Sequence, residues 1–172
     1  SKIYIRNIEK SHFKSITSVY EDAGCEIRET HGIVVITSSG NLKAIEKVTT
    51  QPYPGFPTDM QAQLMASMLK ADGITIIEET VFDSRFKHVP ELQKMGANIT
   101  TIGRVAVIEG VKKLYGAEVE AKDLRGGAAL VIAAMGAEGT TKVNNIHHIN
   151  RGYEKFVNKL QNLGVIITET ND

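Results

Sequence analysis

Two aspartates at corresponding places in the sequence are the first candidates for chemistry. Asp59 follows a stiff lead-in within PYPGFPTDMQAQ, and Asp123 precedes the helix-like stretch LRGGAALVIAAM. Prolines fix their own φ angles and push the preceding residues toward extended backbone, so the approach to Asp59 has few conformations. The more common role of an aspartate at a helix start is N-capping, in which a side-chain oxygen accepts a backbone N–H. Capping and a role in a ligand site both stay open for each aspartate.

Three arginines lie where they could bind an anion. Arg125 comes two residues into an apolar helix, at the positive end of the helix dipole, and therefore needs a negative partner. Arg85 and Arg151 are 66 positions apart and occupy equivalent places before a second helix. An acid with arginines beside it suits a phosphate or carboxylate ligand. Ordinary surface ion pairs between arginine and aspartate are the alternative.

Composition narrows the function classes. The chain has 172 residues, 42% of them hydrophobic, which favours one compact domain. Its 20 basic and 20 acidic side chains give no overall field that would attract nucleic acid or an acidic membrane. The longest uncharged stretch, GGAALVIAAMGA, is too short to span a bilayer. Cys25 is the only cysteine, so no internal disulfide is possible, and we expect a cytoplasmic protein.

Glycines that end amphipathic stretches recur at a nearly constant period. Gly24, Gly96 and Gly164 are separated by 72 and 68 residues and lie in YEDAGCEI, LQKMGANI and LQNLGVII. Gly73 and Gly139 are 66 residues apart, and the two aspartates are 64 apart. Such spacing predicts a repeated unit of helix, strand, helix, strand and strand.

The middle copy is the complete one. It predicts a helix from Asp59 to about Lys70, a strand over 74–79, a second helix over 85–95 and a hairpin over 97–109. The first copy lacks its opening helix, and the last copy ends after a single hairpin strand in VIITET. Because Ser1 leads directly into the strand-like KIYIRN, we expect residues 1–172 to be a single, incomplete domain of about two and a half units.

The opening helices predict the layering. LRGGAALVIAAMGA is apolar on all sides after Arg125, which is typical of a helix buried all round. The strands VAVIEG and TKVNNI alternate apolar and polar residues, as in sheets that are wet on one face. We therefore expect a mixed α/β fold with central helices and outer sheets, in which Gly126 and Gly127 allow close packing.

Several long motifs resemble one family. PYPGFPTDMQAQ, EETVFDSRFKHVPELQKMGA, AKDLRGGAALVIA, AEGTT and HHINRGYEKFVNKLQNLGV are similar, in the same order, to the enolpyruvyl transferases that act on UDP-N-acetylglucosamine. The resemblance covers about residue 50 to the end and implies an inside-out α/β barrel of βαβαββ units. It also implies transfer of enolpyruvyl from phosphoenolpyruvate, with release of phosphate, at the start of bacterial peptidoglycan synthesis.

The same resemblance implies roles for single residues. Asp59 matches the family's aspartate that contacts the acceptor hydroxyl and is its candidate general base. Asp123 matches the acid beside the reacting centre. Val81 falls where the family contacts the UDP-sugar, while Arg125 and Arg151 match arginines that lie toward phosphoenolpyruvate. No metal or organic cofactor is implied.

Departures from the family pattern are also visible. HIN stands in place of the usual HID before Arg151, and FDSRF in place of FENRF around Arg85. The family's cysteine loop and N-terminal lysine have no counterpart, since Cys25 does not correspond to that cysteine. We therefore expect a chain that is inactive without a second domain and that can self-associate. The alternative is a binding or assembly module of the same fold without chemistry.

Overall fold

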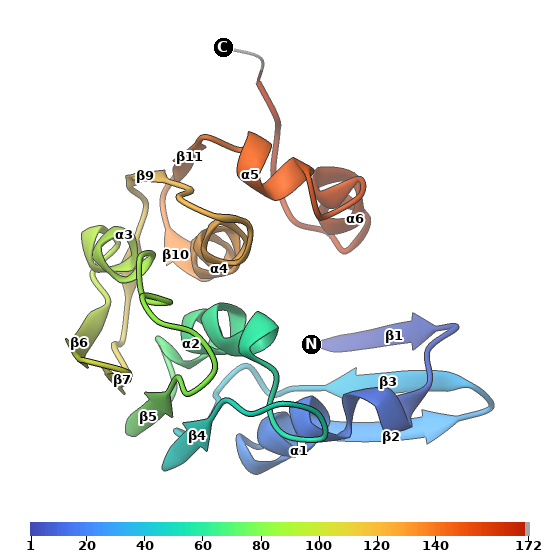
Figure 1. Cartoon of the computed structure of the whole chain (residues 1–172). Helices are drawn as coiled ribbons and strands as arrows, with labels where there is room; N and C mark the ends of the chain where they lie inside the picture. The colour runs from blue at the N-terminus through green and yellow to red at the C-terminus, as the bar shows by residue number, and fades with distance from the viewer. Residues whose placement is uncertain (171–172) are drawn as a thin grey trace.

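The computed structural model describes residues 1–170 and contains three copies of the repeated unit, of which only the middle one is complete (Figure 1). The first copy is a three-stranded antiparallel sheet in the order β1-β3-β2, with one helix between its first two strands. Its elements are β1 (Lys2–Arg6), η1 (Lys10–Phe13), α1 (Lys14–Asp22), β2 (Glu26–Thr30) and β3 (Ile33–Thr37).

The middle copy has the same strand arrangement with an additional strand at its edge. Strands β5, β7 and β6 repeat the order of the first sheet, and β4 pairs with β5 in parallel. The unit is therefore βαβαββ, and the short β4 is the strand that the sequence pattern did not reveal. Its elements are β4 (Lys47–Thr49), η2 (Thr58–Met60), α2 (Gln61–Met68), β5 (Ile74–Glu78), α3 (Val89–Lys94), β6 (Asn98–Ile102) and β7 (Val105–Glu109).

The last copy forms only two parallel strand pairs. Strand β9 pairs with β11 as β4 pairs with β5, and β8 pairs with β10. Its elements are β8 (Leu114–Tyr115), β9 (Glu118–Glu120), α4 (Leu124–Met135), β10 (Ala137–Glu138), β11 (Lys142–Asn144), α5 (His147–Asn150) and α6 (Phe156–Asn162).

The strand predicted over VIITET is wrong for residues 165–170, which form no strand. In the middle copy the equivalent strand β6 pairs only with β7, which lies between β6 and β5. No described strand takes the place of β7 in the last copy, so residues 165–170 have no ladder to join. A single extended segment cannot satisfy its backbone as a strand without such a partner.

Both helices of the middle copy start later than predicted. A 3₁₀ turn covers Thr58–Met60, and the α-helix begins at Gln61. The second helix, predicted over 85–95, runs only over Val89–Lys94, because Pro90 disfavours helical backbone before it and fits the first turn.

Central helices with outer sheets are confirmed. Helices α2 and α4 pack side by side between the sheets (Figure 1), and Leu64, Met65, Ala129 and Leu130 on them are fully buried. The barrel is not closed within residues 1–170. That these residues make up a single incomplete domain stays a prediction.

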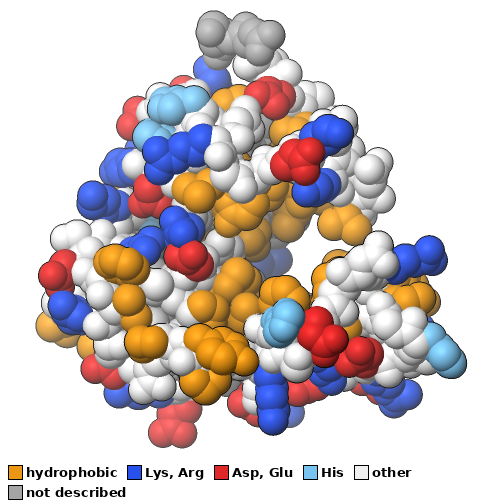
Figure 2. All heavy atoms as spheres, turned by 45° about the vertical axis from the view of Figure 1, so that its right-hand side comes forward, with side chains coloured by type: hydrophobic (Ala, Val, Ile, Leu, Met, Phe, Trp, Pro, Cys, Tyr) orange, Lys and Arg blue, Asp and Glu red, His pale blue; other side chains and the backbone are white. Residues whose placement is uncertain are grey.

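One face of the molecule is hollowed. Figure 2 shows hydrophobic side chains lining a hollow between the lobe that carries β1–β3 and the lobe that carries α5 and α6. Within the part of the chain that the structure describes, no helix has the length and apolar character needed to cross a membrane.

Gly127 tests how tightly α4 is packed. A Cβ atom at this position would lie 2.7 Å from Cγ1 of Ile149 and 2.9 Å from Cβ of Ala121. We expect Gly127→Ala to lower the free energy of unfolding by about 1–3 kcal/mol despite the better helix propensity of alanine. Gly136→Ala is the control, because its Cβ would meet nothing closer than 3.6 Å. Thermal or urea unfolding should show a change within about 0.5 kcal/mol for the control, and equal effects of the two variants would contradict the packing argument.

Candidate functional site

Asp59 and two of the candidate arginines lie together at the beginnings of α2 and α4. Oδ1 of Asp59 is 2.5 Å from Nε of Arg125 and 3.9 Å from Nη2 of Arg85. Close contact with the Asp59 carboxylate raises the pKa of Arg125, against the opposing effect of desolvation. The Asp59 side chain is 57% exposed, so this carboxylate remains open to solvent and to a ligand.

The lead-in to Asp59 is built as its composition suggests. Phe56 is buried and its carbonyl accepts the backbone N–H of Gln51 at 2.8 Å, which closes the loop between them. Pro57 then has extended backbone immediately before the 3₁₀ turn. The loop thus presents Asp59 from a short, constrained segment.

The two aspartates differ in what they do locally. Asp123 is the N-cap of α4, and its Oδ1 accepts the backbone N–H of Gly126 at 2.7 Å. Asp59 makes no such bond, since neither η2 nor α2 has a side-chain cap. The capping interpretation therefore holds for Asp123 and is wrong for Asp59.

His88 is a buried titratable group beneath the aspartates that the sequence analysis did not select. It is 3% exposed, and its Nε2 atom has no hydrogen-bond partner among the described residues. Desolvation lowers the pKa of His88 to about 4, and the nearby charge of Asp123 opposes this effect. His88 is therefore neutral at pH 7. Its position one residue before α3 carried no sequence signal, because a single histidine near a helix start is common.

Val81 lies in the loop that follows β5, next to Phe82, whose ring lies under the guanidinium of Arg85. Val81 is 36% exposed, and the guanidinium of Arg85 lies over the ring of Phe82, 4.5 Å from its centroid. Asp83, where the family pattern has a different residue, forms an ion pair with Arg104. Asp83 thus pairs with Arg104, whereas Arg85 faces Asp59.

Arg151 is the candidate arginine that does not join this cluster. It is exposed and forms the C-cap of α5, and none of the ion pairs within residues 1–170 includes its side chain. The neighbouring Asn150 donates to Glu169 at 2.9 Å. The structure therefore brings Asp59, Asp123, Arg85 and Arg125 together and leaves Arg151 outside.

A small void at the cluster has mixed polarity. It measures about 10 Å³, roughly the space of one water molecule, and is lined by Thr58, Gln61, Ala62, Arg85, His88, Asp123, Arg125 and Gly126. Nε2 of Gln61 is buried there without a protein partner. The two guanidinium groups and the unpaired side-chain amide of Gln61 favour an anion as ligand. The exposed carboxylate of Asp59 next to them can accept a proton, or a hydrogen bond from a hydroxyl group.

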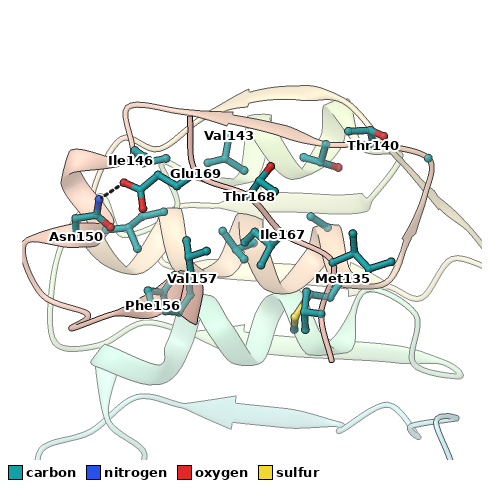
Figure 3. Close-up of a pocket in the computed structure, with 17 residues that line it drawn as sticks. Met135, Thr140, Val143, Ile146, Asn150, Phe156, Val157, Ile167, Thr168 and Glu169 are labelled. Carbon is teal, nitrogen blue, oxygen red and sulfur yellow. Dashed lines mark hydrogen bonds between the residues drawn. The ribbon is translucent and has the colours of Figure 1, made fainter. Parts of the chain in front are cut away.

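A second, larger cavity lies elsewhere and has a different character. It measures about 460 Å³ and is lined mainly by apolar residues of α4, β11, α6 and the segment after α6. Figure 3 shows Val143, Phe156 and Ile167 around it, and the bond from Asn150 to Glu169 at its rim. It adjoins the place where the last copy lacks its middle hairpin strand, and it contains none of the candidate arginines.

Comparison with known proteins gives a consistent family. Residues 1–160 match the model of EPSP synthase (3-phosphoshikimate 1-carboxyvinyltransferase). Two UDP-N-acetylglucosamine 1-carboxyvinyltransferases of Caldanaerobacter subterraneus subsp. tengcongensis are 49% and 50% identical over 92% and 96% of this chain. The matched segments are only 38% and 40% of those two proteins.

Solved structures agree on the fold. The enolpyruvyl transferase NikO from Streptomyces tendae superposes with a TM-score of 0.80 at 28% identity, over 88% of this chain and 35% of its own. EPSP synthase from Acinetobacter baumannii gives a TM-score of 0.64 at 18% identity, over 83% and 34% of the two chains, and supports the fold alone.

Burial of His88 predicts a loss of stability in mild acid. The unfolded chain binds a proton on this imidazole below pH 6.5, whereas the folded chain binds it only near pH 4. The stability from neutral His88 is thus complete above pH 6.5 and is lost as the pH falls to 4, by about 3 kcal/mol. Urea unfolding of His88→Phe should show a correspondingly shallower pH dependence. The exposed His12 provides a control in His12→Gln, and a parent-like slope in His88→Phe would refute the expected linkage.

Proposed function

The chain belongs to the EPSP synthase (3-phosphoshikimate 1-carboxyvinyltransferase) family, and from this premise we propose that it carries one side of a carboxyvinyl-transferring active site. The proposed reaction moves enolpyruvyl from phosphoenolpyruvate to UDP-N-acetylglucosamine and releases phosphate, an early step of peptidoglycan synthesis. The acceptor is inferred from the names of relatives that are 44% to 50% identical to this chain. The observation that carries the proposal is the exposed Asp59 carboxylate held between two guanidinium groups.

Arg85 and Arg125 are proposed to bind the acidic groups of phosphoenolpyruvate. Both face Asp59, and the N–H donors of a guanidinium group match the oxygens of a carboxylate or a phosphate. Without substrate, Asp59 neutralises Arg125. An arriving anion would compete for that guanidinium and so free the Asp59 carboxylate to accept the proton of the acceptor hydroxyl.

The remaining candidates have supporting roles in this proposal. Asp123 caps α4 through Oδ1, which fixes the first turn of the helix that carries Arg125. Val81, which is 36% exposed, is proposed to contact the UDP-sugar. Arg151 is proposed to reach phosphoenolpyruvate only when the site is assembled, because its side chain is exposed and lies outside the cluster.

A complete site is proposed to need a second domain. The chain spans about two fifths of the carboxyvinyltransferases it matches, and a substrate with both a carboxylate and a phosphate group needs donors on more than one side. The alternative function, a nucleotide-sugar-binding or assembly module without chemistry, makes the same contacts but releases no phosphate. A cytoplasmic location follows from the proposed substrates, which are soluble metabolites.

A chimeric enzyme separates these functions. In this chimera, the present chain replaces the matched segment of the Caldanaerobacter subterraneus transferase that is 50% identical to it. We expect phosphate release that depends on both substrates in the chimera and none above background from the chain alone, because half of the site is absent. A chimera that folds and binds UDP-N-acetylglucosamine but never releases phosphate would favour the binding module.

Asp59→Asn in the chimera tests the role of the carboxylate. An amide keeps the size of the side chain but cannot take a proton, so kcat should fall at least about a hundredfold. The melting temperature and UDP-sugar affinity should stay near the parent values, because Asp59 caps no helix. Asp22→Asn at the exposed end of α1 is the matched control. If kcat of Asp59→Asn stays within a few fold of the parent, the proposed base is another group.

The hydrophobic hollow predicts self-association of the isolated chain. Exposed apolar surface of this kind is usually covered by another polypeptide unit, which in the proposed enzyme is the second domain (Figure 2). Sedimentation velocity should show concentration-dependent dimers or larger species of the chain. In the chimera the second domain covers the hollow, so the chimera should show fewer species in sedimentation than the isolated chain. A chain that stays monomeric at high concentration would contradict this expectation.

A further inference from the structure

Four hydrogen-bond donors converge on the buried carboxylate of Glu79. Oε1 accepts a hydrogen bond from the hydroxyl of Thr50 at 2.9 Å. It also accepts hydrogen bonds from the backbone N–H groups of Val81 at 2.9 Å and Phe82 at 3.1 Å. Oε2 accepts a hydrogen bond from the hydroxyl of Thr58 at 2.8 Å. Glu79 is 1% exposed. All the partners donate, which is the arrangement that stabilises an acceptor-only group in the interior.

The two threonines connect Glu79 to both ends of the proline-rich loop. Thr50 follows β4 at the start of the loop, and Thr58 opens the 3₁₀ turn at its end. One carboxylate therefore closes the loop 51–57 across its base. Since Asp59 is the next residue after Thr58, the same bond fixes the backbone from which Asp59 reaches Arg125.

The two backbone bonds fix the other half of the cluster. Val81 and Phe82 form the turn after β5, and the ring of Phe82 carries the guanidinium of Arg85. Glu79 thus holds both partners of the contact between Arg85 and Asp59, one through Phe82 and one through Thr58. This two-sided connection is what a positioning residue requires.

The other two copies of the unit lack this device. The first residue after β1 is Asn7 and the first after β11 is Asn145, and both have left-handed backbone with φ of 59°. Glu79 is the first residue after β5 and does not have positive φ. The repeat therefore does not need a glutamate here for folding, and it occurs in the copy that carries Asp59.

We propose that Glu79 is a positioning residue that sets the geometry of Asp59, Arg85 and Arg125 by accepting four hydrogen bonds from the loop ends around them. Its effect on turnover rests on the proposed function, but its effect on the cluster does not. Glu79→Met keeps the length of the side chain and removes every acceptor oxygen. Thr58→Val removes one hydroxyl at constant shape, and Glu79→Gln keeps an acceptor for the backbone N–H groups.

Nuclear magnetic resonance of the isotope-labelled chain measures the effect of Glu79 on the turn after β5 and on Arg125. In Glu79→Met, we expect the amides of Val81 and Phe82 to exchange at least about tenfold faster than in the parent, while that of Ile108 in the core changes far less. The Nε–H signal of Arg125 should shift in Glu79→Met and in Thr58→Val. It should stay near the parent position in Glu79→Gln.

Glu78→Gln is the matched control. Glu78 is the preceding residue on the same strand, but it faces Lys47 at 2.7 Å and accepts Thr49 at 3.2 Å, away from the loop. The Arg125 signal should not move in this variant. If Glu79→Met does not fold, Thr58→Val decides alone. An unchanged Arg125 signal in folded Thr58→Val would overturn the proposal.

Turnover in the chimera gives a separate result. Thr58→Val should lower kcat about tenfold with little change in KM for the UDP-sugar, whereas Glu79→Gln and Glu78→Gln should stay within a few fold of the parent. Equal loss of kcat in Glu78→Gln and Thr58→Val would contradict a positioning role. If the unsubstituted chimera releases no phosphate, the proposed function fails, and the resonance measurements still decide the role of Glu79.

Discussion

The packing of α2 against α4 is the contact on which the candidate site depends. Each helix belongs to a different copy of the repeat, and each is buried by apolar residues on several faces, so the two helices have no better partner than one another. Because their starts lie at the same end, Asp59 from one copy meets Arg125 from the next. The ion pair is a consequence of this packing and contributes little to it, since both side chains are partly exposed.

The electrostatic arrangement around this contact favours an anionic ligand. Arg125 lies in the first turn of α4, where the unpaired N–H groups already attract negative charge. Asp123 satisfies one of those N–H groups, and His88 beneath it is neutral because burial lowers its pKa. Two guanidinium groups thus face Asp59, and the neutral His88 adds no positive charge to them. An incoming phosphate or carboxylate replaces Asp59 as the partner of Arg125 in the proposed reaction.

The three copies of the unit share a backbone plan and differ in the candidate site residues that they carry. Strands β1, β5 and β11 are equivalent, but only β5 is followed by a glutamate that gathers the ends of a proline-rich loop. The last copy instead contributes Asp123 and Arg125 at the start of its central helix. A repeated fold can specialise in this way because the residues after strand ends and before helices face the centre of the assembly without being needed for the sheets.

The sequence by itself determined the features that depend on neighbours along the chain. Glycine spacing predicted the repeat, apolar helices predicted the central layer, and alternation predicted the hairpin around Gly103. Positions at helix starts and in the repeat selected Asp59, Arg85 and Arg125, which the structure brings together. These features follow from local periodicity, turn chemistry and motif order, all of which can be read without knowing which segments meet.

Only the tertiary structure decided the features that need a distant partner. Residues 165–170 have strand-like composition, yet they form no strand because the intervening hairpin strand is absent from the described chain. Asp59 and Asp123 have similar sequence contexts, but the path of the backbone allows only Asp123 to cap a helix. Glu79 looks like one of two ordinary glutamates, and its role depends on four donors from three segments. Hydrogen-bond satisfaction in the interior is a property of the folded chain, and no local pattern encodes it.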